Sequence, residues 1–152
     1  MSASPSDPPF VWTGRIRFAD TDASTRIHYS SIFRHFEAAE HEFLRAIGHP
    51  YSGLREAGLD YPRVHVECDF HSALCYDDSF AIEVSAARVG ATSYTLTFLV
   101  TTAGKTAARG NITIVCIDKT TGQPHALPAS LAEALRRHAL AAGQETTKQE
   151  GS

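Results

Sequence analysis

The residues best suited to chemistry lie in one polar segment, Asp20 to Tyr29, which follows a stretch with strand periodicity and precedes one with helix periodicity. The segment has no hydrophobic period of its own and is predicted to be a loop. The first N–H groups of a helix are unpaired and partly positive, so they polarise a carbonyl oxygen and stabilise an oxyanion. A carboxylate upstream can attack that carbonyl or activate a water molecule. A thioester suits this arrangement, because its thiolate leaves without a strong general acid.

Three side chains in this segment also have simpler interpretations. An aspartate often closes a polar turn by accepting from its own backbone, and this is the ordinary role for Asp22 taken alone. Asp20 lies nearer to the strand end and is expected to be a structural partner. His28 is placed to hydrogen-bond a carbonyl or a water, with an inert surface histidine as an equal alternative.

Glu40 is a second candidate carboxylate because of its place on the predicted helix. At about 100° per residue it falls within the apolar arc formed by Phe33, Phe36, Leu44 and Ile47. A carboxylate on an apolar face needs a partner or a raised pKa. Glu40 is therefore expected to be either functional or the buried partner of an arginine.

A metal site is not predicted, although four residues have suitable types. Those residues are His65, Cys68, His71 and Cys75. In a strand, the two histidines point to one face while Cys68 points to the other, so one tetrahedral site would have to span both faces. The cysteines are interpreted as core or near-core residues.

The elements that must position the loop are a strand and a long helix. Alternating apolar residues predict a strand over Phe10 to Phe18. Helical spacing predicts a helix over Ile32 to Ile47, with Ser30 and Ser31 as capping residues, and Gly48 and Pro50 end it. A further short helix is expected over Tyr51 to Gly58.

The second half of the chain has the two-residue period of strands. Four segments alternate, around Val64–Phe70, Phe80–Val84, Tyr94–Val100 and Ile112–Cys116, and a short helix is predicted over Leu127 to Leu140. Short connections favour an antiparallel meander covered by the long helix. The fold class predicted is α+β, with about five strands around one central helix.

Composition excludes several functional classes. The chain of 152 residues has a net charge of −3 and no run of basic residues, so nucleic acid is not expected as a partner. No apolar run approaches the roughly 20 residues needed to cross a bilayer. One domain is predicted over residues 10–142, between a disordered lead (1–9) and a disordered tail (143–152). Three cysteines without a signal peptide favour a cytoplasmic location.

The stretch from Arg17 to Glu40 resembles the signature of hotdog-fold acyl-CoA thioesterases of the 4-hydroxybenzoyl-CoA thioesterase group, Asp-x-Asp-x-x-Gly-x-(Val/Ile)-x-Tyr/His before the central helix. The resemblance implies that Asp22 is the catalytic nucleophile or general base. It implies that the backbone N–H of Tyr29 contacts the thioester carbonyl. Two departures stand inside the motif: Thr25 replaces the glycine, where a positive φ is expected, and Arg26 replaces an apolar residue.

The resemblance continues through Ala73–Asp78, Gly90–Tyr94 and Pro124–Pro128. It implies that CoA enters only as part of the substrate, with no metal or other cofactor. Arg88 and Ser93 are candidates for contacting CoA, and an exposed strand-end arginine is the simpler interpretation of Arg88. The family also implies that two protomers join their sheets edge to edge and share active sites, as homodimers or homotetramers.

Three other functions stay open at this point. A carrier-protein thioesterase would use the same residues on a protein-bound thioester. A hotdog dehydratase would combine a histidine such as His28 with a carboxylate. A non-catalytic acyl-CoA-binding module is also possible, because a fold can outlive its chemistry and because Thr25 and Arg26 alter the motif.

Overall fold

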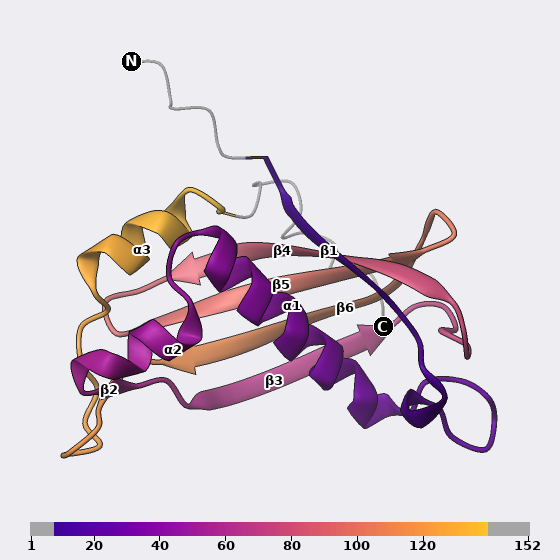
Figure 1. Cartoon of the computed structure of the whole chain (residues 1–152), viewed down its shortest axis with the longest axis horizontal. Helices are drawn as coiled ribbons and strands as arrows, with labels where there is room; N and C mark the ends of the chain where they lie inside the picture. The colour runs from indigo at the N-terminus through magenta and orange to yellow at the C-terminus, as the bar shows by residue number, and fades with distance from the viewer. Residues whose placement is uncertain (1–7, 140–152) are drawn as a thin grey trace.

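The computed structural model describes residues 8–139, which form an antiparallel sheet with a long helix lying across one face (Figure 1). The strands are β1 (Phe10–Arg15), β2 (Leu59–Asp60), β3 (Arg63–Phe70), β4 (Ser79–Val89), β5 (Ser93–Thr102), β6 (Lys105–Val115) and β7 (Ile117–Asp118). The helices are α1 (Ile32–Ala46), α2 (Tyr51–Leu54) and α3 (Ala129–Arg136). The predicted lead and tail fall outside the described residues, apart from residues 8 and 9.

The main sheet has the strand order β1-β4-β5-β6-β3, so the predicted meander is wrong in one respect. Strands β4, β5 and β6 follow one another as hairpins, but β3 pairs with β6 at the far edge rather than with β4. The connection from β3 to β4, residues 71–78, does not make a tight hairpin. It carries backbone hydrogen bonds to the polar loop instead, from Ile27 N–H to Leu74 O (2.8 Å) and from Tyr76 N–H to Thr25 O (3.0 Å).

The first strand ends at Arg15, three residues before its predicted end. Residues Phe18–Asp20 form a 3₁₀ turn, which Asp20 closes by accepting from the Arg17 N–H at 2.8 Å. The turn rotates Phe18 away from the core, so this side chain is 79% exposed although the alternation placed it on the apolar face. The turn starts the loop that carries Asp22.

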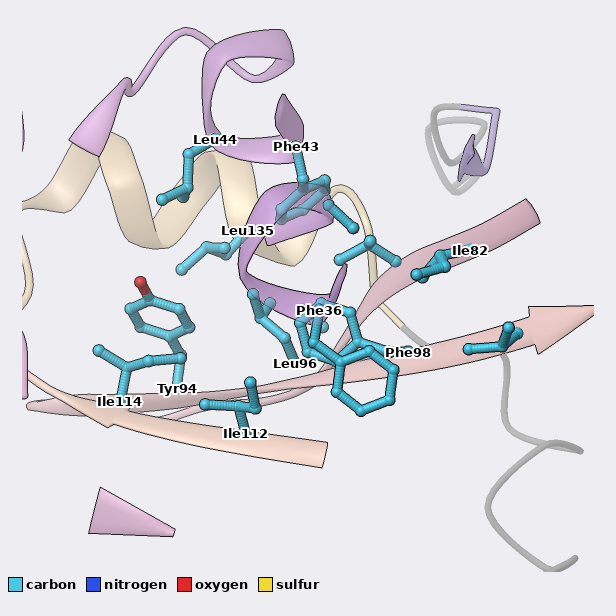
Figure 2. Packing of buried hydrophobic residues seen from close by; sticks show 14 of the residues in the cluster. Phe36, Phe43, Leu44, Ile82, Tyr94, Leu96, Phe98, Ile112, Ile114 and Leu135 are labelled. Atoms are coloured by element: carbon cyan, nitrogen blue, oxygen red, sulfur yellow. The ribbon is translucent and has the colours of Figure 1, made fainter. Parts of the chain in front are cut away.

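Helix α1 is held against the sheet by its apolar face. Phe36 stacks on Phe98 of β5 with ring centroids 4.6 Å apart, and Figure 2 shows the two rings side by side. A Cβ atom at Gly110 of β6 would lie 2.4 Å from the Phe36 ring, so only glycine lets the helix approach this closely. Burying a side chain such as Phe36 contributes about 1.5–3 kcal/mol. This packing fixes the start of α1 relative to the sheet.

The described residues, 8–139, contain no helix long and apolar enough to cross a bilayer.

Candidate active site

The loop before α1 is a compact hairpin-like turn rather than an open segment. Thr21 and Ile27 form an antiparallel bridge across its base. Within it, Asp22 N–H donates to Arg26 O and Thr25 N–H donates to Asp22 O, both at 3.0 Å. Thr25 has φ +66°, which confirms the positive φ expected where the family motif has glycine. A β-branched residue therefore holds the turn in a conformation that costs it energy.

The Asp22 carboxylate is exposed and held by one oxygen. Its Oδ1 accepts hydrogen bonds from the Ser24 N–H (2.8 Å) and from the Ser24 hydroxyl. These bonds hold the pKa of the Asp22 carboxyl below its ordinary value, and the bond from the Ser24 hydroxyl has the largest effect. The charges of His28 and Arg26 lower the pKa further. Asp22 is therefore ionised at neutral pH. Within residues 8–139 its Oδ2 atom has no hydrogen-bond donor and is available for a reaction.

One backbone amide at the helix start is left unpaired. The N–H of His28 donates to Asp20 O (2.8 Å), and the N–H of Ser31 donates to His28 O (2.9 Å). The N–H of Ser30 donates to the Nδ1 atom of His28 (3.2 Å). In the described part of the chain, the Tyr29 N–H alone among these four has no acceptor. It is the amide that the sequence motif assigned to the carbonyl.

His28 rather than a serine caps this first turn, so the predicted capping role of Ser30 and Ser31 is wrong. Residues Tyr29–Ser31 form a 3₁₀ turn, and neither serine side chain accepts from the N–H groups that follow. Because His28 Nδ1 accepts from Ser30, the neutral ring carries its proton on Nε2. The ring stacks on Tyr29 at 4.3 Å between centroids. His28 thus shapes the turn that leaves the Tyr29 amide free.

Asp20 has the structural role predicted for it, through a partner that the sequence did not indicate. Its Oδ2 atom lies 2.9 Å from Nε2 of His35 on α1, and both side chains are only 12% exposed. The same oxygen accepts from Arg17 N–H, and the Asp20 carbonyl accepts from His28 N–H. One residue therefore links the end of β1, the first turn of α1 and the loop between them.

A cleft of about 610 Å³ opens at Asp22. Its other lining residues include Thr21, Thr25 and two exposed aromatic residues, Phe18 and Tyr76. The two aromatic rings meet edge to face at 5.9 Å. Sequence reasoning missed this pair, because the alternation placed Phe18 in the core. An exposed aromatic pair beside an ionised carboxylate provides an apolar wall for a bound group.

Glu40 does not join this site. It is 1% exposed on α1, as its place in the apolar arc predicted, and its Oε1 atom contacts the guanidinium of Arg63. Arg63 also donates to Tyr61 O (2.8 Å) and lies over the ring of Tyr51, 5.2 Å from its centroid. Burial lowers the pKa of the Arg63 guanidinium from its ordinary value. Glu40 has the arginine partner that the sequence left open.

Arg88 and Ser93 contact each other at the turn between β4 and β5, where Arg88 Nη2 donates to Ser93 Oγ at 2.9 Å. Strand β4 begins at Ser79, next to the loop of Asp22, and ends at Val89. At about 3.4 Å per residue, the pair lies about 30 Å from the start of the strand. Arg88 and Ser93 are therefore at the opposite end of the protomer from Asp22 (Figure 1).

No group of three or more His, Cys, Asp or Glu side chains within residues 8–139 is arranged to hold a metal ion.

Comparison with known proteins places this site in a family. The model of the Thioesterase-like superfamily matches residues 16–135, which include the Asp22 loop, α1 and every described strand except β1. The chain belongs to that superfamily. The predictions of a hotdog fold and of a thioester hydrolase are thereby confirmed.

Individual relatives of this thioesterase agree with the family. A solved structure of a hypothetical protein from Aquifex aeolicus is 31% identical, with a TM-score of 0.78, over 84% of this chain and 99% of that one. A solved gentisyl-coenzyme A thioesterase is 26% identical, with a TM-score of 0.76, over 83% and 99%. The 1,4-dihydroxy-2-naphthoyl-CoA hydrolase of Nostoc punctiforme is 24% identical over 125 residues, 82% of this chain and 84% of that protein.

Proposed function

We propose that this thioesterase hydrolyses an acyl-CoA thioester to the free acid and CoA, with Asp22 as the reacting carboxylate and the Tyr29 N–H as the donor to the thioester carbonyl. One observation carries the proposal: among the amides of residues 28–31 that the structure describes, only that of Tyr29 is unpaired. It begins the 3₁₀ turn that leads from the loop of the exposed, ionised Asp22 into α1. An unpaired amide at a helix start is a ready donor to a developing oxyanion.

The reaction follows from these groups. Asp22 Oδ2 attacks the carbonyl carbon, the carbon–sulfur bond breaks, and the CoA thiolate leaves. Water then cleaves the resulting anhydride and returns the carboxylate. In the alternative route Asp22 takes a proton from the attacking water, and no anhydride forms. The lowered pKa of the Asp22 carboxyl keeps the group ionised at neutral pH, which both routes require. No other cofactor takes part in either route.

We further propose an aromatic acyl group. The edge-to-face pair of Phe18 and Tyr76 lines the cleft at Asp22 and suits a flat ring. Two relatives are named for thioesters of aromatic acids, gentisyl-CoA and 1,4-dihydroxy-2-naphthoyl-CoA. The protein acts as a homodimer, or as a tetramer of two dimers, joined through sheet edges. Because Arg88 and Ser93 lie at the opposite end of the protomer from Asp22, they are candidate contacts for CoA bound at the site of another subunit.

A steady-state assay over aryl-CoA, alkyl-CoA and carrier-protein thioesters tests the function. We expect the highest kcat/KM on an aryl-CoA, and a loss of at least about 1,000-fold in kcat for Asp22→Asn. The matched control is Asp118→Asn, because Asp118, the last residue of β7, is also a carboxylate whose pKa is lowered by hydrogen bonds from the residues just after it. This control should keep wild-type activity. Wild-type turnover by Asp22→Asn on the best substrate would refute the assignment.

A further inference from the structure

The Asp22 loop closes on itself at one pair of residues, Asp20 and His28, which we call the neck of the loop. The Asp20 carbonyl accepts a hydrogen bond from the His28 N–H at 2.8 Å. Asp22 lies two residues beyond the neck on one arm of the loop, and Tyr29 directly follows the neck on the other arm. The neck therefore sets the position of the Asp22 carboxylate relative to the Tyr29 amide.

The tip of the loop and its neck are held in different ways. At the tip, the Thr25 carbonyl accepts a backbone hydrogen bond from the Tyr76 N–H, in the connection between β3 and β4. The neck depends on the Asp20 carboxylate, whose Oδ2 atom lies 2.8 Å from the Arg17 backbone N and 2.9 Å from Nε2 of His35. Within residues 8–139, the His35 ring is the only side chain that hydrogen-bonds this carboxylate.

The sheet fixes the ring of His35, which lies in the first turn of α1. The ring meets Phe80 of β4 edge to face at 4.9 Å between centroids, and it lies 6.3 Å from the ring of Trp12 of β1. A Cβ atom at Gly14 would lie 2.7 Å from the Phe80 ring, so the missing side chain leaves room for it. The side chains of His35 and Asp20 are both only 12% exposed, and a hydrogen bond is stronger there than in water. The His35 ring thus connects the packing of α1 on the sheet to the neck.

We infer that His35 is a positioning residue of this thioesterase, which acts through Asp20 to hold the neck of the Asp22 loop closed. The inference rests on the proposed function and adds a residue that touches neither the substrate nor the reacting atoms. Without the His35 donor, the buried Asp20 carboxylate lacks a hydrogen bond and turns toward water. This movement opens the neck, and a misplacement of about 1 Å at a reacting group can cost about 100-fold in rate.

Three substitutions of His35 test whether its Nε2 donor matters. His35→Phe keeps the ring and removes the donor, so kcat on an aryl-CoA should fall at least about tenfold while KM changes by less than about twofold. The amide nitrogen of glutamine is as many bonds from Cβ as Nε2 of histidine, so His35→Gln should keep kcat within about threefold of wild type. The nitrogen of asparagine lies closer to Cβ, so His35→Asn should behave as His35→Phe. Wild-type kcat in His35→Phe, or equal losses in all three variants, would overturn the inference.

Hydrogen exchange of the His28 amide separates positioning from a general loss of stability. His35→Phe should raise the exchange rate of this amide at least about tenfold more than the rates of core amides in β5, and His35→Gln should restore it. The matched control is Leu135→Ala, which removes a fully buried side chain from α3, away from the Asp22 loop (Figure 1). This control should lower stability and keep kcat. Unchanged exchange at His28 in His35→Phe, or an equal loss of kcat in the control, would show that the inference is wrong.

A double variant tests whether His35 acts through Asp20. Asp20→Ala removes the carboxylate that His35 holds, so adding His35→Phe to it should lower kcat no further. Losses that multiply would show that His35 acts by another route and would refute the positioning role. The variant Asp22→Asn keeps the two proposals apart. Wild-type turnover by Asp22→Asn overturns the proposed function, whereas an inactive Asp22→Asn beside a fully active His35→Phe overturns only the role of His35.

Discussion

Two carboxylates, one in the loop before α1 and one in the second half of α1, are held in opposite conditions. In the loop, Asp22 is exposed, is held by Ser24 through one oxygen and has a lowered pKa. Within α1, Glu40 is 1% exposed and contacts the guanidinium of Arg63. A charge that is oriented but still solvated can react, whereas a charge that is buried and paired holds its surroundings together. Residue type alone does not distinguish a reactive carboxylate from a structural one. The burial of the carboxylate and the partners it contacts do distinguish them.

The largest expected difference between the two carboxylates is in stability. Arg63→Ala should lower the free energy of unfolding by about 3 kcal/mol, because it leaves the buried Glu40 carboxylate unpaired. Asp22→Asn should change it by less than about 0.5 kcal/mol. Urea denaturation measures both. Arg45→Ala is the matched control, since Arg45 pairs with Glu42 on the exposed face of the same helix and should cost less than about 0.5 kcal/mol. Equal losses in the free energy of unfolding for Arg63→Ala and Arg45→Ala would show that the buried Glu40 pair contributes no more to stability than the exposed Glu42 pair.

A smaller effect is expected inside the Asp22 loop. Thr25→Gly should raise the free energy of unfolding by about 1 kcal/mol, because glycine adopts a φ of +66° without the steric cost that threonine carries. Thr21→Gly is the control in the same loop: Thr21 has φ −99° and donates its hydroxyl to Phe18 O, so this change should destabilise. Destabilisation by Thr25→Gly, measured by thermal unfolding, would show that the threonine side chain contributes a contact that outweighs the strain.

The smallest expected effect is a shift in pH dependence. In the proposed mechanism the ionised Asp22 is the active form. Its pKa is lowered, so activity should be kept as the pH falls and lost only below the ordinary value of 3.8. The profile of kcat/KM should be flat from neutral pH to about pH 4.5. Ser24→Ala removes the largest cause of the lowered pKa, so the acid limb should move to higher pH. An unchanged acid limb would mean that the hydrogen bond from Ser24 does not set the pKa of the Asp22 carboxyl.

The fold was predictable where it depends on local periodicity. The spacing of apolar residues placed α1 to within one residue, and the two-residue period located β3 to β6. The pairing of β3 with β6 was not predictable, because strand order depends on contacts distant in the sequence. The end of β1 was also missed, since Phe18 continues the alternation although Asp20 turns the chain before it.

The site was predictable where a motif describes backbone geometry. The spacing of Asp22 and Tyr29 relative to the helix indicated the free amide, and the missing glycine indicated the positive φ at Thr25. The hydrogen-bond and ion-pair partners of the side chains were harder to predict from the sequence. Two serines at the helix start have the usual capping chemistry, yet the His28 ring accepts the hydrogen bond. Arg63, on the edge strand far along the chain from Glu40, gave no signal beyond the expectation that some arginine would pair with it.

The central claim is that the Asp22 carboxyl and the Tyr29 amide act on the same carbonyl. A crystal structure of the Asp22→Asn variant with a bound aryl-CoA tests it most directly. The thioester oxygen is predicted to lie about 2.7–3.2 Å from Tyr29 N, with its carbon about 3–3.5 Å from the side chain of residue 22. A thioester bound away from the start of α1, with its oxygen held by other donors, would contradict the account.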